Sequence, residues 1–416
     1  METTTVAIAG GGPAGIILGL LLARAGVEVT VLEKHADFLR DFRGDTVHPS
    51  TQQLLFELGL REEFESIVVG RMSSIRFGTA DQVIVEADLE KVRPRHRFHD
   101  IAIAPQWDLL DLLTRYARRF PAFHLLLSAE VTGTIRDGDR VQGVRYRTQD
   151  GDHELRAVLT IAADGRSSTV RESVGSELRD FKAPLDVLWF RLSREPEDPD
   201  GLTGLLGDRA IAVAINRDTY WQIAYLVTAG RDPEVRSGGL AAFRDAVAAL
   251  LPFAAGRTTE IASFEDVKTL QVRIQQLKRW YAPGILAIGD AAHTMSPMGG
   301  VGINLAVQDG VAAANLLAAP LFRAQQDPLR FERTLSPRLL ARVQRRRKLP
   351  SIVPQAMQAG VQRGLLGKVL ARGTAAIRIP RALRPLLRNG PGAKIVWSIF
   401  GYGLLPEHIR SPERTS

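Results

Sequence analysis

The chain contains no cysteine among its 416 residues. It therefore has no disulfide, thiolate-bound zinc, iron–sulfur cluster or thiol nucleophile, a pattern typical of a reducing cytoplasm. Its eight histidines are scattered and form no His-Glu-x-x-His cluster, so no protein-bound metal is expected. With 45% hydrophobic and 24% charged residues, the composition is that of a globular protein, long enough for two or three domains.

Acidic residues are scarce in the last part of the chain. Residues 341–416 hold fifteen lysines and arginines but only Glu407 and Glu413, a net charge of +13, whereas residues 1–340 carry −5. Either this segment is a helical region with a solvated basic face that covers a substrate site, or its apolar-basic stretches at 361–370 and 395–405 contact a membrane surface. No nucleic-acid-binding module is present, so nucleic acid is not an expected partner.

Charge is also absent from an apolar run near the N-terminus. Residues 6–23 contain no charged side chain, and their length alone would permit a membrane span. The cluster Gly10-Gly11-Gly12-Pro13 would break such a helix near its start, and no basic segment precedes the run. Neither a membrane span nor a secretory signal is therefore expected here.

That run instead carries a dinucleotide-binding pattern. An apolar strand leads into Gly10, Gly12 and Gly15 at G-x-G-x-x-G spacing, and a helix and a second strand end at Glu33. Gly10 permits the sharp turn, Gly12 lets a pyrophosphate approach the backbone, and Gly15 allows close packing of helix and strand. Glu33 can accept hydrogen bonds from ribose hydroxyls and would repel a 2′-phosphate. The sequence therefore predicts tightly bound FAD or NAD rather than NADP.

Hydrophobic periodicity predicts an alternation of strands and helices along the chain. Helices are expected at residues 51–60, 107–120, 240–251 and 303–319. Strands are expected at 75–78, 83–87, 124–127, 141–146, 158–162, 211–215, 220–227 and 285–288, the pair at 211–227 forming a hairpin within a mainly strand-like region 183–275. From residue 330 the chain is expected to be helical, with breaks at Pro350, Pro354, Pro380, Pro385 and Pro391.

Two further motifs each follow an apolar strand. The first is Asp164-Gly165, with Ser167 or Ser168 as a possible N-cap of the next helix. The second is Gly289-Asp290, which continues through a proline- and glycine-rich segment at 297–302 to Asn304 and later to Asp309-Gly310. Both motifs place a carboxylate at the carboxyl end of a strand, where open α/β sheets bind their ligands.

In this order, and together with Arg43-Gly44-Asp45, the motifs resemble the FAD-dependent single-component aromatic monooxygenases, the p-hydroxybenzoate hydroxylase-like family, over about residues 5–320. The resemblance implies an α/β fold: a Rossmann-like FAD-binding domain, an inserted β-rich substrate domain and a helical C-terminal region. The expected boundaries are 1–70, 100–180 and 280–330 for the first, 71–99 and 181–279 for the second, and 331–416 for the third.

The resemblance also assigns residues to the cofactor. They are Gly10, Gly12, Pro13, Ala14, Gly15, Glu33, Lys34, Arg43, Gln106, Asp164, Gly165, Asp290, Pro297, Gly299, Gly300, Gly302 and Asn304. Asp164 and Gly165 match a motif for FAD and for the transient nicotinamide cofactor, and Asp290 matches the acid that binds the ribityl chain. The segment 297–302 matches the loop beside the isoalloxazine ring, where small residues leave space and the following helix dipole favours a reduced, anionic flavin.

No catalytic side chain is assigned. His48 and His293 are interpreted as packing or hydrogen-bonding residues, and Arg166 and Arg171 as charges on a helix surface. The aromatic residues of the middle region line a substrate pocket or fill the sheet core; they are Trp189, Phe190, Tyr220, Trp221 and Tyr225.

The resemblance implies a mechanism in which the cofactor carries the chemistry. NADH or NADPH, which visits because only one complete fingerprint is present, reduces FAD; O₂ then forms a flavin C4a-hydroperoxide that hydroxylates a hydrophobic, aromatic or polyketide-like molecule. The alternatives are a flavin-dependent epoxidase or reductase on the same scaffold, and a non-catalytic, membrane-associated flavin-binding protein. The W-x-W-x-I-P segment of related halogenases is absent.

Overall fold

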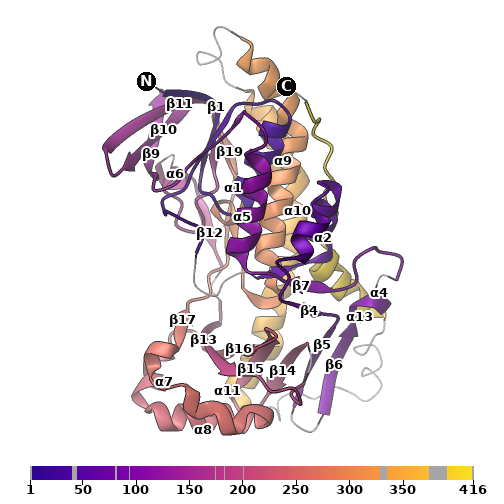
Figure 1. Ribbon diagram of the computed structural model, residues 1–416. Helices are drawn as coiled ribbons and strands as arrows, with labels where there is room; N and C mark the ends of the chain where they lie inside the picture. The colour runs from indigo at the N-terminus through magenta and orange to yellow at the C-terminus, as the bar shows by residue number, and fades with distance from the viewer. Residues whose placement is uncertain are drawn as a thin grey trace.

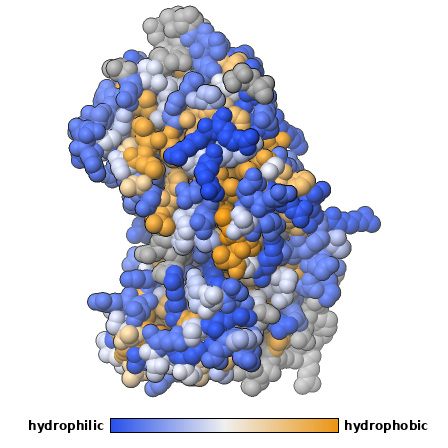
Figure 2. Space-filling view, in the orientation of Figure 1, coloured by the Kyte–Doolittle hydropathy of each residue, from blue (hydrophilic) through white to orange (hydrophobic). Residues whose placement is uncertain are grey.

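The computed structural model describes residues 2–39, 45–79, 82–92, 94–173, 175–181, 183–199, 201–327, 335–373 and 391–414. Two sheets stand one above the other, the upper one flanked by long helices (Figure 1). Figure 2 shows this face of the molecule as mainly hydrophilic, with hydrophobic patches at the left of the upper part and near the middle of the molecule.

An eight-stranded sheet in the order β19-β20-β11-β1-β2-β8 frames the upper part, with β10 and β9 added beside β11. Its strands are β1 (Glu2–Ala9), β2 (Val29–Leu32), β8 (Phe123–Leu126), β9 (Glu130–Asp137), β10 (Arg140–Thr148), β11 (Gly151–Ala162), β19 (Tyr281–Ala282) and β20 (Ile285–Ala287). The central strands β20, β11, β1, β2 and β8 run parallel, so their carboxyl ends share one edge. That edge carries the predicted motifs.

Four helices pack beside this sheet (Figure 1): α1 (Pro13–Arg24), α5 (Gln106–Ala117), α9 (Val301–Gln325) and α10 (Pro337–Val361). Helices α1 and α9 approach so closely that a Cβ on Gly310 would lie 2.4 Å from Ile17 Cγ2. Among the described residues, the segment 298–325 is the one helix that passes a test of length and apolarity for a membrane span, but 72% of its apolar window is buried inside the protein. We therefore interpret α9 as the central core helix.

The lower part is built around a seven-stranded sheet in the order β17-β13-β16-β15-β14-β5-β6. Its strands are β5 (Ser74–Thr79), β6 (Gln82–Asp88), β13 (Leu185–Ser193), β14 (Leu202–Leu206), β15 (Ile211–Asn216), β16 (Tyr220–Thr228) and β17 (Lys268–Leu270). Helices α7 (Asp232–Ser237) and α8 (Leu240–Leu250) lie beside it in Figure 1, and residues of α8 pack on one of its faces. The opposite face packs against α11 (Gly367–Arg372) and Met298.

Two small sheets complete the fold. One joins β3 (Thr46–Val47), β7 (Ile101–Ile103) and β4 (Gly70–Met72); the other joins β12 (Leu178–Asp180), β18 (Gln275–Leu277) and β21 (His293–Thr294). The remaining helices are α2 (Pro49–Glu57), α3 (Arg61–Glu65), α4 (Leu89–Val92), α6 (Thr169–Ser173) and α13 (Pro391–Trp397), with short 3₁₀ or π segments η1 (Pro252–Glu260), η2 (Phe264–Asp266), η3 (Gly289–Ala291), η4 (Met298–Gly300), η5 (Gln362–Leu366) and η8 (Ser398–Tyr402).

The predicted α/β class is confirmed, and β15 and β16 form the expected hairpin. Two local expectations were wrong. Helix α10 runs through Pro350 and Pro354, both buried against the rest of the protein, because tertiary packing outweighs the lost helical hydrogen bonds. Residues 232–266, expected to contain one helix, hold α7, α8, η1 and η2. The predicted breaks at Pro380 and Pro385 lie outside the described residues, and Pro391 begins α13.

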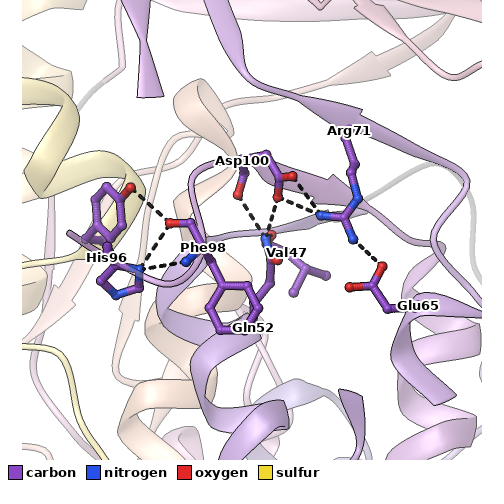
Figure 3. A network of polar contacts seen from close by, with 8 residues as sticks. Val47, Gln52, Glu65, Arg71, His96, Phe98 and Asp100 are labelled. Carbon is purple, nitrogen blue, oxygen red and sulfur yellow. Dashed lines mark hydrogen bonds and ion pairs between the residues drawn. The ribbon is translucent and has the colours of Figure 1, made fainter. Parts of the chain in front are cut away.

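A polar network holds the segment that leads into β7 (Figure 3). Asp100 accepts hydrogen bonds from Arg71 Nη1 at 2.7 and 2.8 Å, and Gln52 Nε2 donates to the carbonyls of Val47 and Asp100 at 3.0 and 2.9 Å. Arg71 also pairs with Glu65. These contacts connect α2, α3, β4 and β7, and so fix the position of the adjacent strand β3.

The C-terminal segment returns across the upper part of the molecule. Tyr402 donates to the carbonyl of Phe98 at 3.1 Å, and the buried carboxylate of Glu407 accepts from Arg346 at 2.6 and 2.8 Å. The backbone N–H of Arg414 donates to the carbonyl of Arg24 at the end of α1. Residues 402–414 of the C-terminal segment are therefore docked on the fold.

His48, the residue before α2, also holds the C-terminal segment in place. Its Nδ1 lies 2.8 Å from the carbonyl oxygen of Phe400, so Nδ1 carries the proton and donates. Burial lowers the pKa of His48 to about 4, against 6.5 for an exposed histidine. Because the folded protein keeps the ring neutral while the unfolded chain takes up a proton, stability falls as the pH is lowered from 6.5 towards 4.

We expect His48 to contribute a loss of about 2 kcal/mol in the free energy of unfolding between pH 7.5 and pH 5. A His48→Asn variant keeps a donor near Nδ1 but does not titrate, so its stability should fall by that much less over the same range. Urea unfolding of both proteins at the two pH values measures the difference. Equal losses in both proteins would contradict the prediction.

Candidate functional site

Three glycine-bearing turns, remote along the chain, meet at the carboxyl edge of the parallel sheet. Gly10 follows β1 with φ +102°, and a Cβ there would lie 2.4 Å from the carbonyl oxygen of Ala163, which follows β11. A Cβ on Gly289, which follows β20, would lie 3.1 Å from the Cβ of Ala14. The close backbone approaches require glycine and bring the three motifs into one site.

The first turn leaves room for a ligand beside the backbone. Apart from its neighbours in the chain, no described residue has an atom within 4 Å of a Cβ built on Gly12, whereas a Cβ on Gly15 would lie 2.0 Å from the carbonyl oxygen of Gly10. Gly12 is the N-cap of α1, provides no side-chain cap and is followed by Pro13. The first N–H groups of α1 therefore remain available to an anion. Glu33 Oε2 accepts from the N–H of Gly11 at 2.9 Å, so this carboxylate lies at the turn.

The second turn holds a carboxylate with an open acceptor. Asp164 Oδ2 accepts from the N–H of Val170 at 3.2 Å, while Oδ1 is buried and has no partner among the residues described. Burial raises the pKa of Asp164 above its ordinary value. Gly165 has φ +84° and open space where a side chain would be. Ser168, one of the two predicted caps, accepts from the N–H of Arg171 at 3.0 Å.

Arg171 connects the second turn to the third. Its side chain is buried, and its guanidinium donates to the carbonyls of Arg166 at 2.8 Å and Ala291 at 3.2 Å. The interpretation of Arg171 as a charge on a helix surface was therefore wrong. A guanidinium offers five donors in a rigid fork, which suits it to hold two backbone turns at a fixed spacing.

The third turn is held by Asp309. This carboxylate is fully buried and accepts from the N–H of Gly289 at 3.1 Å, from Arg347 Nε at 2.9 Å and from His293 Nε2 at 2.6 Å. Burial acts to raise its pKa, but His293 and Arg347 hold the pKa below its ordinary value. Asp309 is therefore ionised, and His293 has the hydrogen-bonding role expected for it.

Asp290 is left open by this arrangement. Its carboxylate accepts no hydrogen bond from the described part of the chain. Burial raises its pKa, whereas His293 and Arg166 act in the opposite direction. An acceptor held at the carboxyl edge without a protein donor fits a hydroxyl-bearing ligand such as a ribityl chain.

The glycine loop before α9 is tightly held. Gly299 and Gly300 both have left-handed φ values, +79° and +61°, and a Cβ on Gly300 would lie 2.2 Å from Thr46 Oγ1. Thr46 Oγ1 donates to the carbonyl of Gly300 at 3.1 Å. Helix α9 begins at Val301, two residues before the predicted start, with Gly300 as an N-cap that provides no side chain. Its first N–H groups therefore open onto the site.

Asn304 acts on this loop through the backbone. Its Nδ2 donates to the carbonyls of Thr46 and Gly300, both at 3.2 Å. Its Oδ1 accepts from the N–H of His48 at 3.0 Å and from Thr51 Oγ1 at 2.7 Å. Since both ends of the amide are used, Asn304 fixes the loop against β3 and α2.

The other predicted cofactor residues lie as follows. Gln106 is the first residue of α5 and is half-buried; Lys34 is exposed beside Glu33; Pro297 is the N-cap of η4; and a Cβ on Gly302 would lie 3.9 Å from Met295 Cγ. Arg43 lies outside the described residues. The roles of Asp309, Arg347 and Arg171 in holding these turns were not predicted, although Asp309 is visible in the sequence as part of an Asp-Gly pair.

An open cleft of about 380 Å³ lies between the second turn and the lower sheet. Arg166 and Ser167 line it from the upper part, and Thr269 and Arg273 from the end of β17 and beyond. Because Arg166 acts electrostatically on Asp290, the cleft adjoins the third turn. One acid, Asp232, also lines the cleft and pairs with Arg236, so the two lining arginines remain in excess and suit an anionic visitor.

The residues present fit FAD. The free space at Gly12, the uncapped start of α1, the unpartnered Oδ1 of Asp164 and the open carboxylate of Asp290 match a pyrophosphate with hydroxyl-bearing groups on either side. The glycine pair at 299–300 and the uncapped start of α9 match a flat ring with a carbonyl edge.

Comparisons with known proteins agree with this geometry. Residues 3–333 match the family described as "FAD binding domain". The chain is 30% identical over 410 residues to the 6-methylpretetramide 4-monooxygenase of Streptomyces rimosus, covering 98% of this chain and 94% of that protein.

Two solved structures share the fold. They are p-nitrophenol 4-monooxygenase from Pseudomonas putida DLL-E4, with a TM-score of 0.76, 20% identity and coverage of 96% and 97%, and the anhydrotetracycline hydroxylase of Streptomyces rimosus, with a TM-score of 0.70, 22% identity and coverage of 96% and 76%. The chain therefore belongs to the p-hydroxybenzoate hydroxylase-like family of FAD-dependent monooxygenases.

Proposed function

We propose that this FAD-dependent monooxygenase uses NADH or NADPH and O₂ to hydroxylate a hydrophobic aromatic or polyketide-like small molecule. The convergence of the three glycine turns on one open edge carries the proposal. The relative from Streptomyces rimosus, which matches over nearly its whole length, is named for a polycyclic substrate, and a structural neighbour for a nitrophenol. FAD supplies electron transfer from the nicotinamide and the activation of O₂.

We propose that the chain's own residues hold and orient this cofactor in the roles predicted for them. We also propose the predicted domain boundaries. Strands β5 and β6 join the same sheet as β13 to β17, which supports the assignment of residues 71–99 and 181–279 to one substrate domain. Asn304 contributes by fixing the loop, since its amide is already fully used.

Side-chain alternation separates the aromatic residues that were candidates for the substrate site. Phe190, Trp221 and Tyr225 are buried on the face covered by α8 and belong to the sheet core. Trp189 lies on the opposite face, partly buried in the cluster that contains Met298 of the glycine loop. We therefore assign Trp189 and Met298 to the wall of the substrate chamber, because both pack against the apolar cluster between this face of the sheet and α11.

We propose that the cleft at Arg166 and Arg273 receives the visiting nicotinamide nucleotide. Its charge complements a pyrophosphate, and it adjoins the turn that carries Asp290. The openness of the cleft to solvent suits a cofactor that binds and leaves in each cycle.

The function is tested on the purified full chain. We expect flavin absorbance, oxidation of NADH or NADPH that a phenolic or polycyclic aromatic probe accelerates, oxygen consumption, and a product heavier by one oxygen atom. Turnover without oxygen consumption would indicate a reductase, and an epoxide product an epoxidase. A protein that binds no FAD after reconstitution would refute the proposal.

Substitutions of Gly12 and of Gly15 should distinguish an effect on cofactor binding from an effect on folding. Gly12→Ala places a methyl group in open space on ordinary extended backbone, φ −76° and ψ −177°, so the FAD-free protein should keep its thermal stability while FAD affinity falls at least about tenfold. Gly15→Ala meets the carbonyl of Gly10 and should destabilise the FAD-free protein itself. Thermal unfolding and flavin fluorescence titration measure the two effects; unchanged FAD affinity in Gly12→Ala would contradict the assignment.

We further propose that the enzyme, in the cytoplasm, docks on anionic lipid through its C-terminal region. Residues 341–406 contain no acid. Five of the nine large hydrophobic side chains exposed among the described residues also lie here: Leu349, Val361, Ile395, Val396 and Leu405. Exposed apolar side chains in a segment that is rich in cations and has no acid of its own favour an interfacial contact, and a hydrophobic substrate would be concentrated at such a surface.

Sedimentation with vesicles of phosphatidylcholine and phosphatidylserine tests this docking. Reversal of two exposed charges of α10, Arg342→Glu with Arg345→Glu, should reduce the bound fraction at least about tenfold, because each cation near the surface contributes about 1 kcal/mol. Arg61→Glu with Arg118→Glu, exposed outside the basic segment, serves as the control and should bind as the wild type does. Wild-type protein that stays in the supernatant would refute the proposal.

A further inference from the structure

Three buried glutamines of the C-terminal region face the glycine loop. Gln355 and Gln358 lie on α10 and Gln362 begins η5, so their spacing places them along one side of a continuous helical segment. All three side chains are buried. A buried primary amide is stabilised only when it finds hydrogen-bond partners, so the partners show what these side chains do.

Most of the partners lie along the segment 294–298. Gln355 Nε2 donates to the carbonyl of Thr294 at 2.9 Å and to that of Gln275, in the neighbouring strand β18, at 3.3 Å. Gln358 Nε2 donates to the carbonyls of Ser296 at 3.2 Å and Met298 at 2.6 Å, and Gln362 Nε2 donates to Ser296 Oγ. The carbonyls of residues 294, 296 and 298 therefore all lie within hydrogen-bonding reach of this one side of the helical segment. The glutamines of this helical segment therefore bind the loop from residue 294 to Met298, the first residue of η4.

The amides serve the loop at some cost to themselves. The side-chain oxygens of Gln358 and Gln362 are buried and accept no hydrogen bond from the described residues. An apolar side chain would avoid two orphaned acceptors. The presence of amides here, despite this cost, thus indicates that these side chains serve to fix the loop carbonyls and not only to pack.

The C-terminal segment also holds the far end of the loop. A Cβ on Gly299 would lie 3.0 Å from Phe400 Cδ1, and Phe400 packs with Met295 and Val301 on either side of the glycines. Its backbone carbonyl is the acceptor for His48 Nδ1. The two left-handed glycines are therefore confined between β3, α10 and η8.

We propose that Gln355, Gln358 and Gln362 are positioning residues for the flavin, since they fix the path of the loop at 294–300. FAD binding and the docking of the C-terminal helix are then coupled: each strengthens the other by the same factor. This inference rests on the proposed assignment of the loop to the flavin ring.

The same helix offers a matched control. Gln344 is also buried on α10, donates through Nε2 to the carbonyl of Lys278 at 2.9 Å and accepts from the N–H of Trp280 at 3.2 Å. These partners lie outside the glycine loop. Gln358→Met and Gln344→Met each replace a buried amide by a thioether of similar shape and remove two hydrogen bonds, so they share the general cost to stability.

We expect Gln358→Met to weaken FAD binding about tenfold and to shift the flavin absorbance bands, and Gln344→Met to leave both within about twofold of the wild type. Titration of the FAD-free proteins by flavin fluorescence measures the affinities. Unchanged affinity and spectrum in Gln358→Met, or equal losses in both variants, would overturn the inference. A wild-type chain that binds no FAD would instead refute the proposed function.

Hydrogen exchange on the unaltered chain tests the coupling without a variant. FAD should slow amide exchange in residues 355–362 and 398–402 as well as in the loop at 294–300, and leave residues 340–344, which precede Arg347, unchanged. Protection confined to the loop would overturn the inference even if the loop binds the flavin.

Discussion

The buried carboxylate of Asp309 is the constraint on which the site depends. An unpaired charge at zero exposure would be prohibitively unstable, so its three donors are required for the fold to form around it. The donors come from the turn after β20, from β21 and from α10, and each is therefore held relative to the others. Since the turn carries Asp290 and β21 leads into the glycine loop, one buried charge fixes both cofactor-facing segments and the C-terminal helix together.

The C-terminal region is consequently part of the site. Arg347 enters the core to reach Asp309, and its neighbour Arg346 pairs with the buried Glu407, which draws the last segment back across α9 and α10. Arg342 and Arg345, on the same helix, are exposed. Among the described residues, the excess of positive charge visible in the sequence thus divides between a few side chains that hold the site together and a larger exposed set.

The parts of the fold that sequence predicted obey local rules. A tight turn between strand and helix needs glycine whatever surrounds it, and so the motifs at Gly10, Gly165 and Gly289 could be read directly. The predicted helix break at Pro350 was wrong because α10 is stabilised by contacts with residues far away in the sequence, and local helix propensity does not include such contacts. The pairing of Arg171 with the carbonyl of Ala291 spans 120 residues and leaves no local pattern. Alternation along β13 could separate Trp189 from Phe190, but only the structure shows which face meets the loop.

The two helices that open onto the site share one feature. Helices α1 and α9 begin at Gly12 and Gly300, which offer no side chain to accept the first N–H groups. A glycine cap sacrifices some helix stability, and the uncapped N–H groups together with the positive end of the helix dipole attract negative charge. The α1 terminus then suits a pyrophosphate and the α9 terminus the carbonyl edge of a flat ring, so the same residue type that shapes each turn also leaves its donors free for the ligand.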